Sequence, residues 1–156
     1  MELWWGASKG GRAMQIEIDP LSEVPLYQQL RDRILEAIAE GRLLPGDQLT
    51  SVRQLAVAFG INVATVSKGY ELLRYEGLIR INQKSGSVVA RSPESSPASA
   101  EFVADWVVRL RTLLAEAYVQ GVSSRQLVEL SKESVEEFAA AFGANSSARD
   151  YEGDIR

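Results

Sequence analysis

The sequence has 156 residues, of which 46% are apolar and 24% charged, a composition typical of one soluble domain or of a small domain with an appendage. It has no cysteine and no histidine, so it lacks the residues that most often act as nucleophiles, imidazole bases and transition-metal ligands. We therefore expect no enzyme activity, no catalytic residue, no metal site and no cofactor. We also expect no membrane span, because no apolar run approaches the roughly 20 residues that one requires.

The net charge of −4 is unevenly distributed along the chain. Residues 51–91 contain six basic and two acidic side chains, whereas residues 92–156 contain six basic and eleven acidic ones. A cationic segment on an otherwise acidic protein is attracted to phosphate groups. Nucleic acid is therefore a candidate partner in spite of the negative total.

The N-terminal residues 1–13 show no usable periodicity, and we predict a disordered extension. The run of glycine and basic residues before Met14 could be translated from a purine-rich ribosome-binding site, which would make Met14 the natural initiator. A helix is then predicted over residues 25–40, with Gly41 as its C-terminal stop. Its apolar face would consist of Leu26, Leu30, Ile34, Ala37 and Ile38.

Residues 51–75 predict two short helices joined by a turn, because the apolar pattern stops at Gly60 and resumes on a new phase. Ser51 and Gln54 form the S-x-x-Q pattern of a capping box at the first helix. Gly60 can adopt the left-handed conformation that ends a helix, and Asn62 can cap the next one. The expected buried stripes are Leu55, Ala56 and Phe59 in the first helix and Val66, Tyr70 and Leu73 in the second.

Residues 78–91 alternate around a glycine-containing turn at 84–86, which predicts a β-hairpin. The order helix, helix-turn-helix, hairpin is that of a winged helix-turn-helix domain, which we expect over residues 14–91. The fold class is thus mainly α with a small β-hairpin wing. In this arrangement the first helix of the pair braces the second, which lies in a DNA major groove.

A polar Pro/Ser-rich linker is predicted at residues 92–100, followed by a two-helix dimerisation or effector region over 101–143 and a disordered tail over 144–156. Two helices cannot enclose a core alone, so their apolar faces predict a homodimer that forms a four-helix arrangement. A ligand pocket around Trp106 is the alternative. The predicted dimerisation residues are Phe102, Val103, Trp106, Val107, Leu110, Leu113, Leu114 and Ala117.

Four stretches between Pro25 and Val89 resemble the GntR family of bacterial transcription regulators: PLYQQL, LLPGDQLTSVRQLA, GINVATVSKGY and YEGLI. They are most similar to its YtrA-type subgroup, which also has a short C-terminal region. The resemblance implies a homodimer that represses genes from a palindromic double-stranded DNA operator, typically including an adjacent transporter operon. A cytoplasmic location is expected separately, from the composition and the lack of an apolar run of membrane-spanning length. It also leaves room for a small-molecule effector of unknown identity.

The resemblance further implies which residues contact DNA. Arg53 matches a contact at the start of the first helix of the pair, and Gly86 matches the glycine at the tip of the wing. Lys84 stands where the wing commonly has another glycine, Thr50 where the family usually has proline, and Ala64 where a hydrogen-bonding residue is common. The predicted DNA-binding residues are Ser51, Arg53, Asn62, Ala64, Thr65, Ser67, Lys68, Lys84 and Gly86.

Two other functions remain open from the sequence. The winged helix could be a protein-interaction or assembly module without sequence-specific DNA binding, a role for which the local positive charge is unnecessary. An enzyme is disfavoured by the missing histidine and cysteine. For individual residues, the alternative to DNA contact is a solvated surface charge at Arg53, Lys68 and Lys84, and a purely structural helix cap at Asn62.

Overall fold

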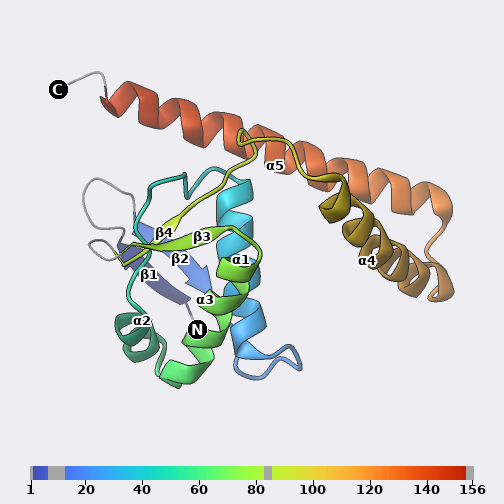
Figure 1. Ribbon diagram of the computed structural model, residues 1–156. Helices are drawn as coiled ribbons and strands as arrows, with labels where there is room; N and C mark the ends of the chain where they lie inside the picture. Colours follow the sequence, from blue (N-terminus) through green and yellow to red (C-terminus); the bar gives the residue numbers. More distant parts are fainter. Residues whose placement is uncertain (1, 7–12, 83–85, 154–156) are drawn as a thin grey trace. The chain divides into compact units, whose positions relative to one another are not determined.

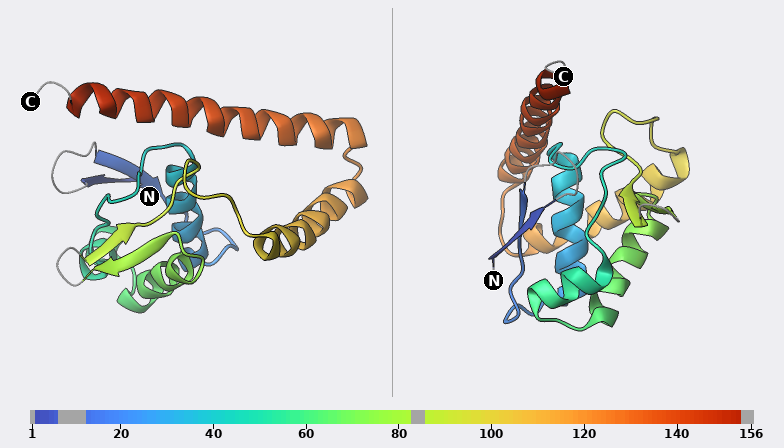
Figure 2. Two further views of the ribbon diagram at one scale, coloured as in Figure 1. Left: turned by 45° about the horizontal axis from the view of Figure 1, so that its top comes forward. Right: turned by 90° about the vertical axis from the view of Figure 1, so that its left-hand side faces the viewer.

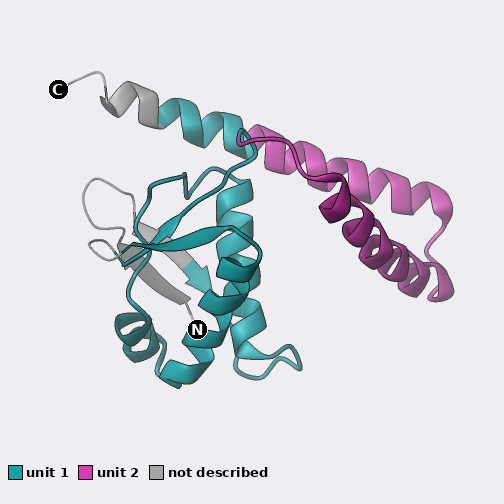
Figure 3. Cartoon of the chain, viewed as in Figure 1, with its two compact units in different colours: residues 1–94, 141–156 teal, residues 95–140 magenta. Residues whose placement is uncertain are grey.

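The structure, a computed structural model, describes residues 2–6, 13–82 and 86–153 (Figure 1). The chain forms two compact units: unit 1, residues 1–94 and 141–156, and unit 2, residues 95–140 (Figure 3). In chain order the elements are β1 (Glu2–Gly6), β2 (Ala13–Glu17), α1 (Leu26–Ala39), α2 (Val52–Phe59), α3 (Val63–Tyr75), β3 (Ile79–Asn82), β4 (Gly86–Val89), α4 (Ala100–Val119) and α5 (Ser124–Gly153). The predicted fold class, mainly α with a hairpin wing, is confirmed.

Unit 1 is built on three helices, with α1 and α2 both packed against α3 (Figures 1 and 2). The predicted apolar stripes are confirmed, since each helix turns its stripe into one shared core. Burial of these side chains is the main driving force for folding. The core residues supplied by the three helices are Leu30, Ile34, Ala37, Ile38, Leu55, Ala56, Phe59, Val66, Tyr70 and Leu73.

The turn between α2 and α3 forms as the sequence predicts. Ser51 Oγ accepts a hydrogen bond from the backbone N–H of Gln54 at 3.3 Å and donates one to Gln54 Oε1 at 2.8 Å. Gly60 has a φ of 63°, the left-handed conformation that glycine adopts without steric cost. Asn62 Oδ1 accepts from the N–H of Ala64 at 2.8 Å and caps α3.

The wing is an antiparallel pair of strands, β3 and β4, in a register that runs from Ile79 opposite Val89 to Asn82 opposite Gly86. The predicted hairpin is confirmed, although its tip at 83–85, with Lys84, lies outside the described residues. The segment before α2 lies along β4, since Leu49 donates its N–H to the carbonyl of Ser87 at 2.8 Å. The wing is therefore joined to the helix-turn-helix by backbone hydrogen bonds.

The prediction of a disordered extension is wrong for Glu2–Gly6, which form β1 and pair with β2 from Glu2 opposite Glu17 to Gly6 opposite Ala13. The reason lies at the end of β2 and just beyond it, where Ile16 and Ile18 are 1% and 2% exposed in the core. A strand anchored in this way offers an edge of unpaired backbone groups, with which a second strand can pair. Residues 7–12 lie outside the described residues.

The prediction of a disordered tail is wrong as far as Gly153, because α5 continues to that residue. Phe142, within the predicted dimerisation or effector region 101–143, is 7% exposed and lies against Gly41 within unit 1. Asn145 donates from Nδ2 to the carbonyl of Glu40 at 2.8 Å, which satisfies a backbone acceptor at the end of α1. These contacts stabilise a segment whose own composition does not favour a helix.

Unit 2 consists of α4 and the first part of α5. The described residues between β4 and α4, 90–99, form neither helix nor strand, and Ser99 caps α4 through the N–H of Phe102 at 3.1 Å. Ser123 and Gln126 form a reciprocal capping box before α5. Within the described ranges, no helix is long and apolar enough to span a membrane.

Candidate nucleic-acid interface

The outer surface of α3 carries small and polar side chains. Val63, Ala64 and Lys68 are exposed, whereas Thr65 and Ser67 are half-buried. The opposite side of the helix holds the stripe that enters the core, so the register of α3 is fixed by burial. A helix with this division can present its first two turns to another molecule without disturbing the fold.

α3 lies unusually close to α1 because residue 69 is glycine. A Cβ atom added to Gly69 would lie 2.9 Å from the carbonyl oxygen of Tyr27 and 3.3 Å from Cδ2 of Leu30. Glycine is otherwise unfavourable inside a helix by roughly 1 kcal/mol relative to alanine. Gly69 therefore lowers the intrinsic stability of α3 but allows α3, the predicted recognition helix, to pack closely against α1.

Lys68 extends from α3 over an aromatic ring of α1. Its Nζ lies 3.8 Å from the centroid of the Tyr27 ring, a distance typical of a cation–π interaction. The lysine is nevertheless exposed, so its charge stays accessible to a phosphate. The half-buried Tyr27 ring thus supports a predicted DNA-contacting cation.

Arg53 occupies the first turn of α2 and is exposed. No hydrogen bond or ion pair joins its guanidinium to another residue in the described part of the chain. Ser51, two residues earlier, uses its hydroxyl to cap the helix. The Arg53 guanidinium is therefore available to bind a phosphate or a guanine edge, whereas the Ser51 hydroxyl is already hydrogen-bonded to Gln54.

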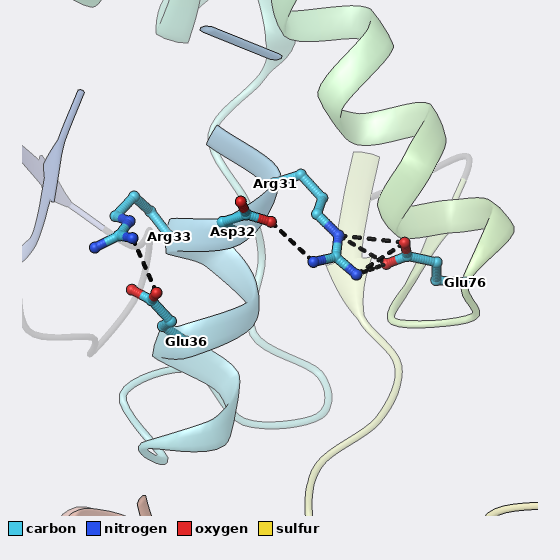
Figure 4. Close-up of polar contacts among 5 residues, drawn as sticks. All are labelled: Arg31, Asp32, Arg33, Glu36 and Glu76. Carbon is cyan, nitrogen blue, oxygen red and sulfur yellow. Dashed lines mark hydrogen bonds and ion pairs between the residues drawn. The ribbon is translucent and has the colours of Figure 1, made fainter. Parts of the chain in front are cut away.

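One of the two acidic residues in the cationic segment is neutralised by an ion pair. Glu76, at the C-cap of α3, accepts hydrogen bonds from Nε and Nη2 of Arg31 on α1 (Figure 4). Burial acts to lower the pKa of Arg31, but its hydrogen bonds with Asp32 and Glu76 outweigh that effect and the pKa is raised. The guanidinium therefore stays charged and offsets the charge of Glu76 at the end of α3, while Asp32 adds one negative charge on α1.

Tyr70 combines packing with a polar contact that sequence reasoning missed. It is 5% exposed, and its hydroxyl donates a hydrogen bond to the backbone carbonyl of Thr50 at 2.8 Å. Burial raises the pKa of the Tyr70 hydroxyl, which keeps it protonated as a donor. The available signal was the residue type itself, because a tyrosine in a buried stripe needs an acceptor for its hydroxyl.

The wing contributes Gly86, at the first position of β4, with a φ of 72°. Residues with a side chain rarely adopt this backbone conformation, so glycine is favoured at the start of β4, directly after the tip of the wing. Arg80 on β3 is also exposed and was not among the predicted contacts. Unit 1 therefore brings together α3, the start of α2 and the wing, whereas the site of Lys84 is not described.

Comparisons with known proteins point to the same elements. Residues 26–89, which span α1 to β4, match the family described as "Bacterial regulatory proteins, gntR family". The HTH-type transcriptional repressor YtrA of Bacillus subtilis (strain 168) is 33% identical over 118 residues, 76% of this chain and 90% of that protein.

Two solved structures share the fold. YtrA from Sulfolobus acidocaldarius, a GntR-family transcription factor, is 39% identical, with a TM-score of 0.52 over 67% of this chain and 97% of that one. A transcriptional antiterminator from Listeria monocytogenes EGD-e is 25% identical, with a TM-score of 0.70 over 78% of this chain and 90% of that one. These likenesses extend beyond the winged helix into the C-terminal helices.

Proposed function

Because this chain belongs to the GntR family, with YtrA-type relatives, and is a DNA-binding transcription regulator, we propose that it acts as a dimeric repressor on a palindromic operator. The observation that carries the proposal is the exposed surface of unit 1 formed by α3, Arg53 and the wing. The Bacillus relative is named a repressor, which favours repression rather than activation by this chain. Control of a neighbouring transporter operon, in the cytoplasm, is part of the proposal.

In the proposed complex the first turns of α3 enter the major groove. Arg53 and Lys68 supply positive charge for phosphates or guanine edges, and the Thr65 hydroxyl suits a phosphate. Val63 and Ala64 have no hydrogen-bonding side chain, so they suit thymine methyl groups or readout of DNA shape. Asn62, Ser67, Lys84 and Gly86 complete the proposed contact set, together with Ser51, whose hydroxyl would have to exchange its bond to Gln54 Oε1 for one to DNA.

The dimer is proposed to form through unit 2. α4 has 20 residues and none of them is buried, although Trp106 and Leu113, 45% and 61% exposed, are large apolar side chains. An apolar groove of about 460 Å³ lies on this unit and is lined by Val107, Leu110, Arg111, Leu114, Ala115, Tyr118 and Leu127. A second copy of the hairpin would cover these residues and complete a four-helix core.

Dimerisation sets the operator geometry. Two α3 helices related by a two-fold axis read half-sites about one helical turn of DNA apart, roughly 34 Å. A two-helix unit does not enclose a ligand by itself, so an effector would bind between two copies and alter the spacing of the α3 helices. We infer no enzyme activity, in keeping with relatives that are named transcription regulators.

A titration of the full chain against DNA from upstream of its own coding sequence, beside a scrambled duplex of equal length, tests the proposal. We expect preference for the upstream DNA, two protomers per site and an affinity that falls steeply as salt rises, because phosphate contacts release counterions. Equal, weak binding to both duplexes would contradict it and favour the protein-interaction module. Light scattering of the free protein tests the dimer separately, and a monomer at micromolar concentration would exclude it.

A further inference from the structure

Three DNA-facing elements of unit 1 meet at one short stretch of chain, residues 47–51, here called the junction segment. On one side it pairs with the wing, since Val89 donates its N–H to the carbonyl of Asp47 at 2.9 Å and Leu49 donates to Ser87 at 2.8 Å. At its end Ser51 caps α2. The position of α2 relative to the wing is therefore set by where this segment runs.

The third element, α3, reaches the junction segment through Tyr70. The Tyr70 hydroxyl donates to the carbonyl of Thr50 at 2.8 Å, a contact between residues 20 positions apart. The tyrosine is 5% exposed, so without this acceptor its hydroxyl would be buried and unpaired, which would destabilise the folded state. The carbonyl of Thr50 lies outside the helix, and threonine, unlike proline, does not lock its own φ. The hydrogen bond thus adds a restraint from α3 at a residue whose own φ is not locked.

We propose that Tyr70 is a positioning residue for DNA binding: its hydrogen bond to Thr50 holds the first turn of α2, and with it Arg53, in register with α3 and the wing. Arg53 lies three residues after Thr50, in the turn that this contact fixes. The inference rests on the proposed role of Arg53 as a DNA contact. Because α2, α3 and the wing must meet one rigid duplex together, a shift of one of them weakens binding even when the core stays folded.

A double-mutant cycle separates positioning from simple stabilisation. The four full-length proteins are wild type, Tyr70→Phe, Arg53→Ala and the double variant, each titrated with the operator duplex by fluorescence anisotropy. Phenylalanine keeps the buried ring and removes only the hydroxyl. We expect Tyr70→Phe to weaken binding about 2- to 10-fold in the wild-type background. In the Arg53→Ala background we expect no further loss, because the residue that Tyr70 positions is already absent.

Tyr75→Phe is the matched control, since Tyr75 is 92% exposed on the same helix and its hydroxyl is not buried. Independent losses in the two single variants, or wild-type binding by Tyr70→Phe, would overturn the inference while leaving the proposed function intact. A wild-type protein that does not prefer the operator would overturn both. Amide hydrogen exchange gives a readout that does not depend on DNA: we expect faster exchange at Gln54 and Leu55 in Tyr70→Phe only, and unchanged exchange there would overturn the inference.

Discussion

Arg31 on α1 and Glu76 at the end of α3 form a bidentate ion pair, with Nε and Nη2 of the arginine 2.8 to 3.2 Å from both carboxylate oxygens (Figure 4). The side chains are only 19% and 29% exposed, and Asp32 accepts from Nη1 at 2.8 Å. A fork of this geometry is more favourable than a single contact between mobile side chains. It fixes the C-terminal end of α3 against α1, as Gly69 fixes its middle.

Replacement of Glu76 by glutamine is expected to lower the free energy of unfolding by about 0.5 to 1 kcal/mol, because Arg31 loses one of its two carboxylate partners in a partly buried place. Urea denaturation measures the change. Glu71→Gln is the matched control, since Glu71 lies on the same helix and is exposed. Equal effects of the two substitutions would show that the ion pair contributes nothing beyond general electrostatics.

We expect the contribution of Glu36 to the free energy of unfolding to depend on pH in the opposite direction to that of most carboxylates. Burial raises its pKa above the ordinary value of 4.5, and the ion pair with Arg33 only partly opposes this. The folded state therefore binds the Glu36 proton more tightly than the unfolded state does. Ionisation of Glu36 destabilises the folded protein at pH values above the pKa of the folded state, and this destabilisation disappears below pH 4.5. We expect Glu36→Gln to be more stable than wild type at pH 7.

The difference between Glu36→Gln and wild type should shrink as the pH falls toward 4.5, because the wild-type carboxyl becomes neutral there. Denaturation curves at several pH values measure this convergence. The exposed Glu23, replaced in the same way, provides the control. A Glu36→Gln variant that is less stable at pH 7 would mean that the ion pair with Arg33 outweighs the burial of the carboxyl.

Gly69→Val should destabilise the protein by about 1 to 3 kcal/mol, the usual effect of overpacking a core. Glycine and valine differ little in helix propensity, so the loss would report the close approach of α3 to Tyr27 and Leu30. Gly143→Val is the control, because a Cβ at that helical glycine meets nothing within 4 Å. The two free energies of unfolding are compared by urea denaturation, and similar values would argue that α1 and α3 can separate without cost.

The parts of the fold that follow from neighbouring residues could be predicted. The caps at Ser51 and Asn62 and the left-handed Gly60 depend on side chains within three positions, so the boundaries of α2 and α3 are readable. Burial then fixes which surface of α3 is exposed. Part of the candidate site could be predicted in the same way, because the apolar periodicity of α2 and α3 places Arg53 and Lys68 on the exposed surface of these helices.

The contacts between distant residues could not be predicted in this way. Asn145 and Glu40 are 105 positions apart, and no local pattern relates the end of α5 to the end of α1. The pairs formed by Tyr70 with Thr50 and by Lys68 with Tyr27 likewise depend on how α3 packs against its neighbours. Non-local contacts also outweigh weak local propensity: β1 is held by its pairing with β2, and the part of α5 around Phe142 and Asn145 by its contacts with the end of α1.

Substitutions at Tyr27 should separate its ring from its hydroxyl in DNA binding. If the ring holds Lys68 toward the operator, Tyr27→Leu should weaken binding about 2- to 5-fold, as expected from loss of a cation–π interaction at an exposed site. Tyr27→Phe retains a ring and should bind like wild type. Anisotropy titrations at one salt concentration measure both. Equal affinities of the leucine and phenylalanine variants would assign no role to the ring.

Phe142→Ala should release the end of α5 from unit 1 without unfolding the rest of that unit. Phe142 is 7% exposed, with Cδ2 3.0 Å from the place where a Cβ on Gly41 would lie, so truncation removes the buried ring and leaves only the backbone atoms of residue 142 beside Gly41. We expect amide exchange of residues 141–148 to accelerate roughly tenfold or more, while amides of the α1 core keep their protection. Phe138→Ala is the control, because Phe138 is 38% exposed and belongs to unit 2. If both variants exchange alike, the helix is held by its own hydrogen bonds, and the order of this segment does not depend on contact with Gly41.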